Sequence, residues 1–302
     1  MLFVLISAYF SVGRDFRVST RLKKLWVQVF FYSVVCMAAY ALLGRTGVVR
    51  GSFIHVLELR EIISSFLPIT FIAYWFVSAF FVMTLLAPYL NRFIGALSEK
   101  ELLAFTGVCL YITFGWKYLN PQAGYFTDVL YFLSIYLIAA CCKTFSNKLP
   151  HITWWMVILI TVVSLAICCA GTHAIRQKGY YVEQMGYKSN LFTAGLGASP
   201  LFAVIIGTVI FLYTMQLENS RDSLMGNFIL ASAPATFGVY LIHENFLLKP
   251  VLWHYVFLIP SGSGALKLGV AAVTIVVLFC VLMLISYVIQ KLIMVPLLKR
   301  IH

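Results

Sequence analysis

The sequence predicts an all-α fold: a polytopic transmembrane helix bundle of about eight full spans plus a partial N-terminal one. Of the 302 residues, 62% are hydrophobic and 11% are charged, whereas a soluble globular protein carries about 25% charged residues. The mean hydropathy is +0.95, which is too apolar for a surface in water. The net charge of +12 is typical of the cytoplasmic Lys and Arg residues that orient membrane helices, so we expect no nucleic-acid partner.

Charge-poor apolar stretches of about 20 residues predict the full spans. They cover residues 25–43, 69–90, 102–119, 125–142, 152–170, 198–217, 226–246 and 268–290. Residues 2–12 form a shorter stretch. At about 1.5 Å per residue it covers roughly 17 Å of a hydrocarbon core about 30 Å thick, too little to cross it. We therefore expect one integral membrane domain over residues 1–302, truncated at its N-terminus by at least one missing helix.

The orientation follows from the first loop, RDFRVSTRLKK (14–24), which is the most cationic segment of the chain. Because cytoplasmic loops carry an excess of Lys and Arg, we place this loop and the C-terminus in the cytoplasm. The cations have two interpretations. They set the topology and attract anionic lipid headgroups, or they bind a phosphate-rich cytoplasmic donor, since Arg and Lys suit diphosphates and phosphomonoesters. The residues concerned are Arg14, Arg17, Arg21, Lys23 and Lys24.

Tyr74 and Trp75 lie near the outer end of the predicted span 69–90. Aromatic residues at this depth are typical of the belt that anchors helices at the headgroups. The alternative interpretation is a sugar-binding cleft, because flat aromatic faces stack on the C–H surfaces of sugars.

The segment FGVYLIHEN (237–245) ends an apolar helix on His243, Glu244 and Asn245. In the predicted topology these residues lie at the outer end of the span 226–246, and ionisable groups at membrane depth tend to face a cavity or a partner. His243 is a candidate general base that a carboxylate such as Glu244 can orient. The alternative interpretation is an interfacial histidine that binds water where the helix leaves the membrane.

Residues 52–67 predict a short interfacial helix between the first two full spans. His55, Glu58 and Glu61 lie three residues apart on it, a spacing that allows a metal ion. A solvated polar face is the favoured interpretation, and we predict no metal site.

Four segments carry a resemblance to a known family. They are FVLISAYFS (3–11), RLKKLWVQVFFYS (21–33), YWFVSAFFVMTLLAPYLNRFI (74–94) and FGVYLIHEN (237–245). In content and order they resemble the membrane acyltransferases of the acyltransferase 3 family that modify bacterial cell-surface polysaccharides.

The resemblance implies transfer of an acyl group, most often acetyl from acetyl-CoA, to a sugar hydroxyl on the far side of the membrane. Arg21 and Lys24 match the spacing of the family's cytoplasmic donor motif, with Lys in place of the second Arg, and Ala8 replaces a family glycine. The family's catalytic histidine lies on a first helix that has no counterpart in this sequence.

These observations together predict a multi-pass O-acyltransferase of the bacterial plasma membrane with a cytoplasmic C-terminus. Its partners are an acyl-CoA donor, a glycan acceptor and membrane lipids, and it holds no bound cofactor. We assign acyl-donor binding to the five cations of residues 14–24, catalysis to His243 and Glu244, and acceptor binding to Tyr74, Trp75 and Asn245. The alternatives are a transporter or flippase of lipid-linked oligosaccharide and, less favoured because the outer loops are modest, a polysaccharide polymerase.

Overall fold

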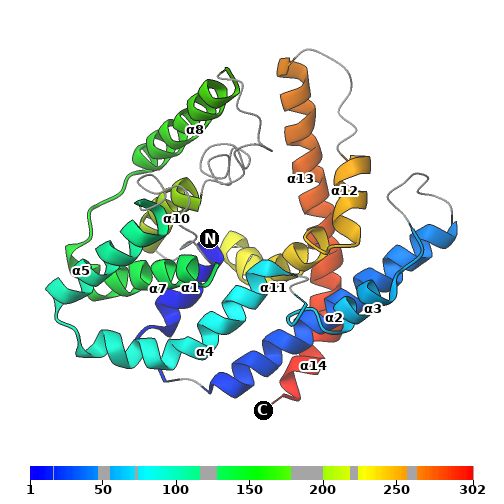
Figure 1. The fold of residues 1–302 in the computed structure, drawn as a ribbon, viewed down its shortest axis with the longest axis horizontal. Coiled ribbons are helices and arrows are strands. Elements are labelled where there is room, and N and C mark those ends of the chain that lie inside the picture. The colour runs from blue at the N-terminus through cyan, green and yellow to red at the C-terminus, as the bar shows by residue number, and fades with distance from the viewer. Residues whose placement is uncertain are drawn as a thin grey trace. The chain divides into compact units, whose positions relative to one another are not determined.

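The computed structural model describes residues 1–15, 17–46, 55–71, 74–115, 128–177, 200–217, 224–256 and 264–301. Every regular element in these ranges is a helix, as the sequence predicts (Figure 1). Contacts divide the chain into two compact units, each discontinuous in sequence. The first comprises Met1–Phe16 and Val82–Asn219, and the second comprises Arg17–Phe81 and Ser220–His302. The assignment of residues 1–302 to a single domain stays a prediction.

The first unit is built around α7. Its helices are α1 (Leu2–Ser11), most of α4 (Trp75–Ala96), α5 (Glu99–Leu110) with the π-helical turn η1 (Tyr111–Gly115), α7 (Asp128–Thr144), the 3-10 turn η2 (Ser146–Lys148), α8 (Trp154–Gln177) and α10 (Pro200–Met215). Helices α1 and α5 both pack against α7, and α10 packs against α1 and α8. Phe132, Ile135 and Ala139 of α7 are completely buried, so this helix supplies the centre of the unit's core.

Side chains from α4 and α7 hold the C-terminal end of α1. The Lys143 ammonium donates to the carbonyl oxygens of Tyr9 and Val12. The Asn91 amide donates to the carbonyl of Ser11 at 2.9 Å, and Asn91 in turn accepts a hydrogen bond from Tyr136 at 2.7 Å. The last carbonyls of a helix have no partner within the helix, and these two side chains provide partners for carbonyls at the end of α1.

The second unit surrounds α2 (Val18–Thr46) and α11 (Leu224–His243). Its other helices are α3 (Leu59–Phe66), the first turns of α4, α12 (Leu248–Val256), α13 (Gly264–Ile289), the π-helical turn η3 (Gln290–Met294) and α14 (Val295–Lys299). Helix α11 packs against α2, α12 and α13, while α3 and α12 also contact α2 (Figure 1). Val29, Tyr32, Tyr74 and Leu241 form part of one buried cluster in this unit.

Helices α11 and α13 approach closely at Gly238. The Ser286 hydroxyl donates to the carbonyl of Ala235 at 2.6 Å and shares a 3.1 Å hydrogen bond with the Tyr32 hydroxyl. A Cβ atom at position 238 would lie 2.0 Å from the Ser286 Oγ and 2.3 Å from the Tyr32 Oη. This contact is possible because residue 238 has no side chain.

Four helices are long and apolar enough to cross a membrane, judged by length and composition over the described residues. They are Val18–Thr46, Trp75–Ala96, Trp154–Gly171 and Ala272–Lys299. The apolar helices Leu2–Ser11 and Leu201–Met215 are shorter. Each predicted span contains a helix, although parts of 69–90, 102–119, 125–142 and 198–217 lie outside the described residues. An all-helical membrane protein is therefore confirmed, whereas about eight full spans are not.

Two predicted boundaries differ from the structure. Helix α2 begins at Val18, before the apolar span predicted from residue 25, because Leu, Lys and Arg are good helix formers that continue the helix beyond its apolar part. The interfacial helix was expected over 52–67, but α3 begins at Leu59 behind a capping box in which Glu58 and Glu61 bond each other's backbone. The expectation of one helical face for His55, Glu58 and Glu61 was therefore wrong, because His55 and Glu58 precede the helix.

Candidate functional site

His243 is the last residue of α11, and its ring is fixed by a local hydrogen bond. Its Nδ1 lies 2.9 Å from the carbonyl oxygen of Val239, and the ring packs edge-to-face against Tyr240 with 5.9 Å between centroids. A carbonyl oxygen only accepts hydrogen bonds, so Nδ1 carries the proton in this contact. In the neutral ring the lone pair is then on Nε2. The side chain is partly exposed, so Nε2 is placed to accept a proton from a ligand.

Glu244 lies beside this nitrogen without bonding to it. Its Oε1 is 3.7 Å from the His243 Nε2, and its Oε2 is 2.7 Å from the Lys249 ammonium. A separation of 3.7 Å is too long for a hydrogen bond. The ring orientation is thus set by Val239, and Glu244 is placed to stabilise a positive charge that develops on the ring. The catalytic roles of both residues stay predictions.

Asn245 and Tyr74 form a buried pair directly beyond the histidine. The Asn245 amide donates to the Tyr74 hydroxyl at 2.8 Å, and this hydroxyl donates to the carbonyl of Leu241 at 3.0 Å. The Asn245 Oδ1 accepts from the backbone N–H groups of Leu247 and Leu248 at 3.1 and 3.3 Å. The pair therefore holds the corner between α11 and α12, and its acceptor-binding role stays a prediction.

Trp75 differs from this pair because its side chain is 45% exposed. Its ring packs edge-to-face on Phe76, which leaves aromatic surface open to a ligand or to lipid. Of the three residues predicted to bind the acceptor, Trp75 is the one that the structure leaves accessible.

Four of the five predicted donor-binding cations belong to the second unit. Arg17 precedes α2, and Arg21, Lys23 and Lys24 lie in its first turns. Lys23 lines a cavity of about 450 Å³ whose other walls are mostly apolar. The lining residues are Leu22, Lys23, Trp26, Val27, Phe81 and Ile301. A cation at the rim of an apolar cavity suits a ligand that joins a phosphate to a less polar chain.

Arg14 belongs to the first unit and is described apart from the other four cations. Its guanidinium lies 5.9 Å from the centre of the Phe10 ring, and its carbonyl accepts a hydrogen bond from Asn91 at 3.3 Å. The side chain is exposed, directly beyond the C-terminal end of α1.

The cations of α2 and the histidine of α11 lie toward opposite ends of α2. Cys36, Tyr40, Leu247 and Leu248 share a buried cluster, and Ile242 packs against it. The C-terminal end of α11 therefore contacts the C-terminal half of α2, whereas the cations occupy its first turns. With 29 residues, α2 is about 44 Å long at about 1.5 Å per residue, more than the hydrocarbon core of about 30 Å.

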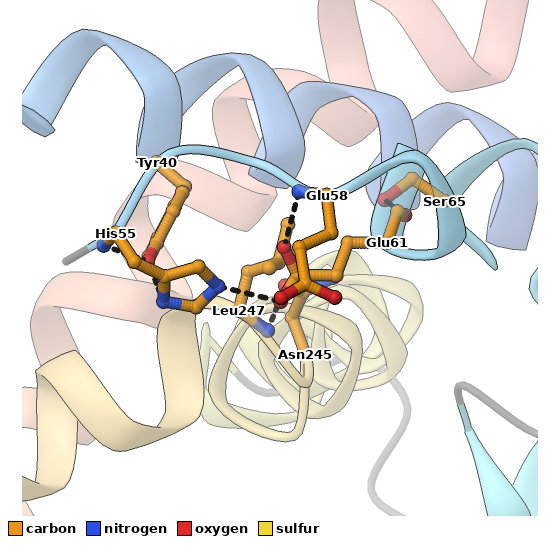
Figure 2. A network of polar contacts seen from close by, with 7 residues as sticks. All are labelled: Tyr40, His55, Glu58, Glu61, Ser65, Asn245 and Leu247. Atoms are coloured by element: carbon orange, nitrogen blue, oxygen red, sulfur yellow. Dashed lines mark hydrogen bonds and ion pairs between the residues drawn. The ribbon is translucent and has the colours of Figure 1, made fainter. Parts of the chain in front are cut away.

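A second polar cluster, not assigned a function from the sequence, joins α2 to the segment before α3. His55 lies between Tyr40 and Glu61 (Figure 2). Its Nε2 is 2.8 Å from the Glu61 Oε1, its Nδ1 is 3.2 Å from the Tyr40 hydroxyl, and its backbone N–H donates to the same hydroxyl. The sequence singled out His55 and Glu61 for their spacing, but Tyr40 lies in an apolar run that carries no such signal.

The spacing of His55, Glu58 and Glu61 noted in the sequence can be compared with the contacts of the described residues. No group of three or more His, Cys, Asp or Glu side chains lies among the described residues in an arrangement that could hold a metal ion. His55 and Glu61 are bonded to each other and to Tyr40, so the spacing noted in the sequence serves a hydrogen-bond network.

Comparison with known proteins identifies the family. Residues 1–291 match a family model described as an acyltransferase domain. Comparison with curated proteins and with solved structures gives no match. The match covers nearly the whole chain, including the cations of α2 and the His243 segment. The chain therefore belongs to the acyltransferase 3 family of membrane acyltransferases.

Proposed function

We propose that this protein transfers an acyl group, in the simplest case acetyl, from a cytoplasmic acyl-CoA to a hydroxyl of a cell-surface polysaccharide or another glycan. It acts in the bacterial plasma membrane, with residues 17–24 and the C-terminus in the cytoplasm. The observation that supports this most is the arrangement along α2. Cations occupy one end, and a histidine with a fixed ring contacts the other half through α11.

The donor site is proposed at the first turns of α2. Arg17, Arg21, Lys23 and Lys24 bind the phosphate groups of coenzyme A, since guanidinium groups bind phosphates in a bidentate manner and Lys adds point charge. Arg14 lies in the first unit, and its part in donor binding stays a prediction from the sequence. The cavity of about 450 Å³ beside Lys23 suits the start of the pantetheine arm, which continues between the helices toward His243.

The chemistry proposed for His243 is general base catalysis. Its Nε2 takes the proton of the acceptor hydroxyl while the hydroxyl oxygen bonds to the thioester carbonyl carbon. The carbon–sulfur bond then breaks, and the imidazolium returns its proton to the thiolate of coenzyme A. Glu244 stabilises the imidazolium across the 3.7 Å gap. Trp75 stacks on the sugar, and the buried Tyr74–Asn245 pair keeps the end of α11 in place.

The test supplies membranes that contain the full chain with acetyl-labelled acetyl-CoA and measures base-labile label on glycan. His243→Asn retains a side-chain N–H near the position of Nδ1 but lacks Nε2, so it should abolish labelling without weakening coenzyme A binding. His151→Gln, at an exposed position before α8, is the matched control. Undiminished labelling in His243→Asn removes this residue from the chemistry.

The donor site is tested separately by binding of coenzyme A to the purified chain. Arg21→Ala/Lys24→Ala should reduce both binding and labelling, and labelling that survives in this variant argues against the proposed site. If wild-type membranes incorporate no label but translocate lipid-linked oligosaccharide, the transporter interpretation replaces the acyltransferase.

A further inference from the structure

A second cavity lies at the C-terminal end of α2, opposite the cations of its first turns. Its volume is about 530 Å³, within the roughly 300–1,000 Å³ that is usual for small-ligand sites. It is lined by Tyr40, Ala41, Gly44, Arg45, His55, Val56 and Leu57. All these residues belong to the second unit, and none of them has a role in the proposed transfer.

The lining is positively charged. Among the described lining residues there are one guanidinium and one imidazole, and there is no carboxylate. Glu61, the acidic side chain that bonds to His55, uses Oε1 for His55 and Oε2 for the backbone N–H of Glu58. Within the described part of the chain, Arg45 has no ion pair with an acidic side chain. Its guanidinium is therefore available for an anion, which it can bind in a bidentate manner.

The wall opposite Arg45 is held in place before any ligand arrives. Both ring nitrogens of His55 have protein partners, the Tyr40 hydroxyl and the Glu61 carboxylate. His55 is thus a fixed part of the wall and not an open base. Ala41, Val56 and Leu57 add apolar surface that suits the C–H faces of a sugar ring or a glycerol backbone. A pre-organised polar wall reduces the entropy lost on binding.

We propose that this cavity binds an anion carried on a hydroxyl-bearing group, with Arg45 as its anchor. Two molecules present this chemistry at a membrane surface: an acidic sugar with a carboxylate, and the phosphoglycerol headgroup of a lipid. The position at the far end of α2 from Lys24, about 32 Å along the helix at about 1.5 Å per residue, puts the site on the opposite side of the membrane from the donor cations. Binding requires no acyl transfer, so this inference stands or falls independently of the proposed reaction.

The test measures binding to the full chain in phosphatidylcholine nanodiscs. Oligogalacturonate should bind at least ten times more tightly than a neutral maltooligosaccharide of equal length, and affinity should fall as NaCl is raised. Arg45→Gln should lower the affinity about tenfold or more, and Arg45→Lys should restore part of it. Arg60→Gln, on exposed α3 and outside the lining, is the matched control and should bind as the wild type does.

The second arm uses nanodiscs that contain phosphatidylglycerol and counts retained lipids by native mass spectrometry. Retention that depends on Arg45, without binding of oligogalacturonate, assigns the site to the lipid headgroup and still supports an anion site. Absence of both signals, or an equal loss in Arg45→Gln and Arg60→Gln, overturns the proposal. Thermal unfolding of each variant in detergent separates lost binding from lost folding.

Discussion

The side-chain amide of Asn245 donates to the hydroxyl of Tyr74 at 2.8 Å, across a sequence separation of 171 residues. The bond ties the residue that precedes α4 to the corner between α11 and α12, next to His243. Both side chains are buried, with exposed fractions of 1% for Tyr74 and 0% for Asn245. The Tyr74 hydroxyl also donates to the carbonyl of Leu241 at 3.0 Å, so this side chain bonds to the segment on both sides of His243.

Tyr74→Phe tests what these hydrogen bonds contribute to stability. The substitution leaves the Asn245 amide and the Leu241 carbonyl without their partner in a buried place, which costs about 1–3 kcal/mol of unfolding free energy. Tyr89→Phe is the control, since Tyr89 on α4 is 69% exposed. Thermal unfolding in detergent should show a lower midpoint for Tyr74→Phe alone. Equal unfolding midpoints for the two variants would show that the hydrogen bonds of the Tyr74 hydroxyl contribute nothing to stability.

Gly238→Ala should destabilise the second unit. A methyl group there overlaps the Ser286 Oγ and the Tyr32 Oη. Helices α11 and α13 must then separate, or the hydrogen bond between these two hydroxyls must break. Overpacking of this kind costs about 1–3 kcal/mol. Gly107→Ala is the matched control, because a Cβ at position 107 of α5 meets nothing within 4 Å. If both alanine variants unfold at the wild-type midpoint, the contact at Gly238 does not exclude a methyl group.

Lys143→Met should loosen the end of α1 in the first unit. It removes two hydrogen bonds from an ammonium group to helix-end carbonyls, and bonds to charged groups contribute about 1.5–3 kcal/mol each. The comparison is Lys148→Met, which breaks an exposed ion pair with Glu99 worth about 1 kcal/mol or less. Hydrogen exchange of the α1 amides should accelerate only in Lys143→Met, and unchanged protection there would contradict the capping role.

Glu101 gives the start of α5 a pH dependence. Its carboxylate accepts hydrogen bonds from the Ser98 hydroxyl at 2.6 Å and the Ser98 backbone N–H at 2.8 Å. These bonds, the hydroxyl first, hold the pKa of Glu101 below its ordinary value of 4.5. A depressed pKa contributes stability that is complete above the ordinary value and is lost as pH falls through the folded-state value.

Ser98→Ala removes the hydroxyl bond to Glu101 but keeps the backbone bond. The difference in stability between this variant and the wild type should therefore shrink when the pH is lowered from 7 to 3.5. Thermal unfolding in detergent at both pH values measures it. Glu101→Gln keeps a side chain that can accept the backbone N–H but does not titrate. The difference in stability between Glu101→Gln and Ser98→Ala should therefore not shrink between pH 7 and pH 3.5. A gap between wild type and Ser98→Ala that stays constant with pH refutes the assignment.

The sequence predicted the helices well because each needs an apolar stretch to lie in lipid or in a core, and such stretches are visible residue by residue. The apolar span predicted from residue 25 covers only part of α2, because charged residues that extend a helix leave no hydropathy signal. The sequence also identified His243 and Glu244 as neighbours, since both lie on one segment.

Contacts between distant segments could not be predicted from the sequence. Tyr32 and Ser286 are 254 residues apart, and each lies in an apolar run where a single hydroxyl looks unremarkable in the sequence. The same holds for Tyr40, whose hydroxyl completes the His55 network, and for Lys143, whose partners are backbone carbonyls of α1. Such pairs depend on which helix faces meet, and no local pattern specifies that.

One consequence follows from α2 being a single unbroken rod. Lys23 of one cavity and Arg45 of the other are separated by about 33 Å along the helix at about 1.5 Å per residue. In the proposed topology the two residues therefore lie on opposite sides of the bilayer, and a solute that does not permeate reaches only one of them. Sealed vesicles of opposite sidedness would therefore separate the two: coenzyme A added outside inverted vesicles meets Lys23, whereas an acidic oligosaccharide added outside right-side-out vesicles meets Arg45.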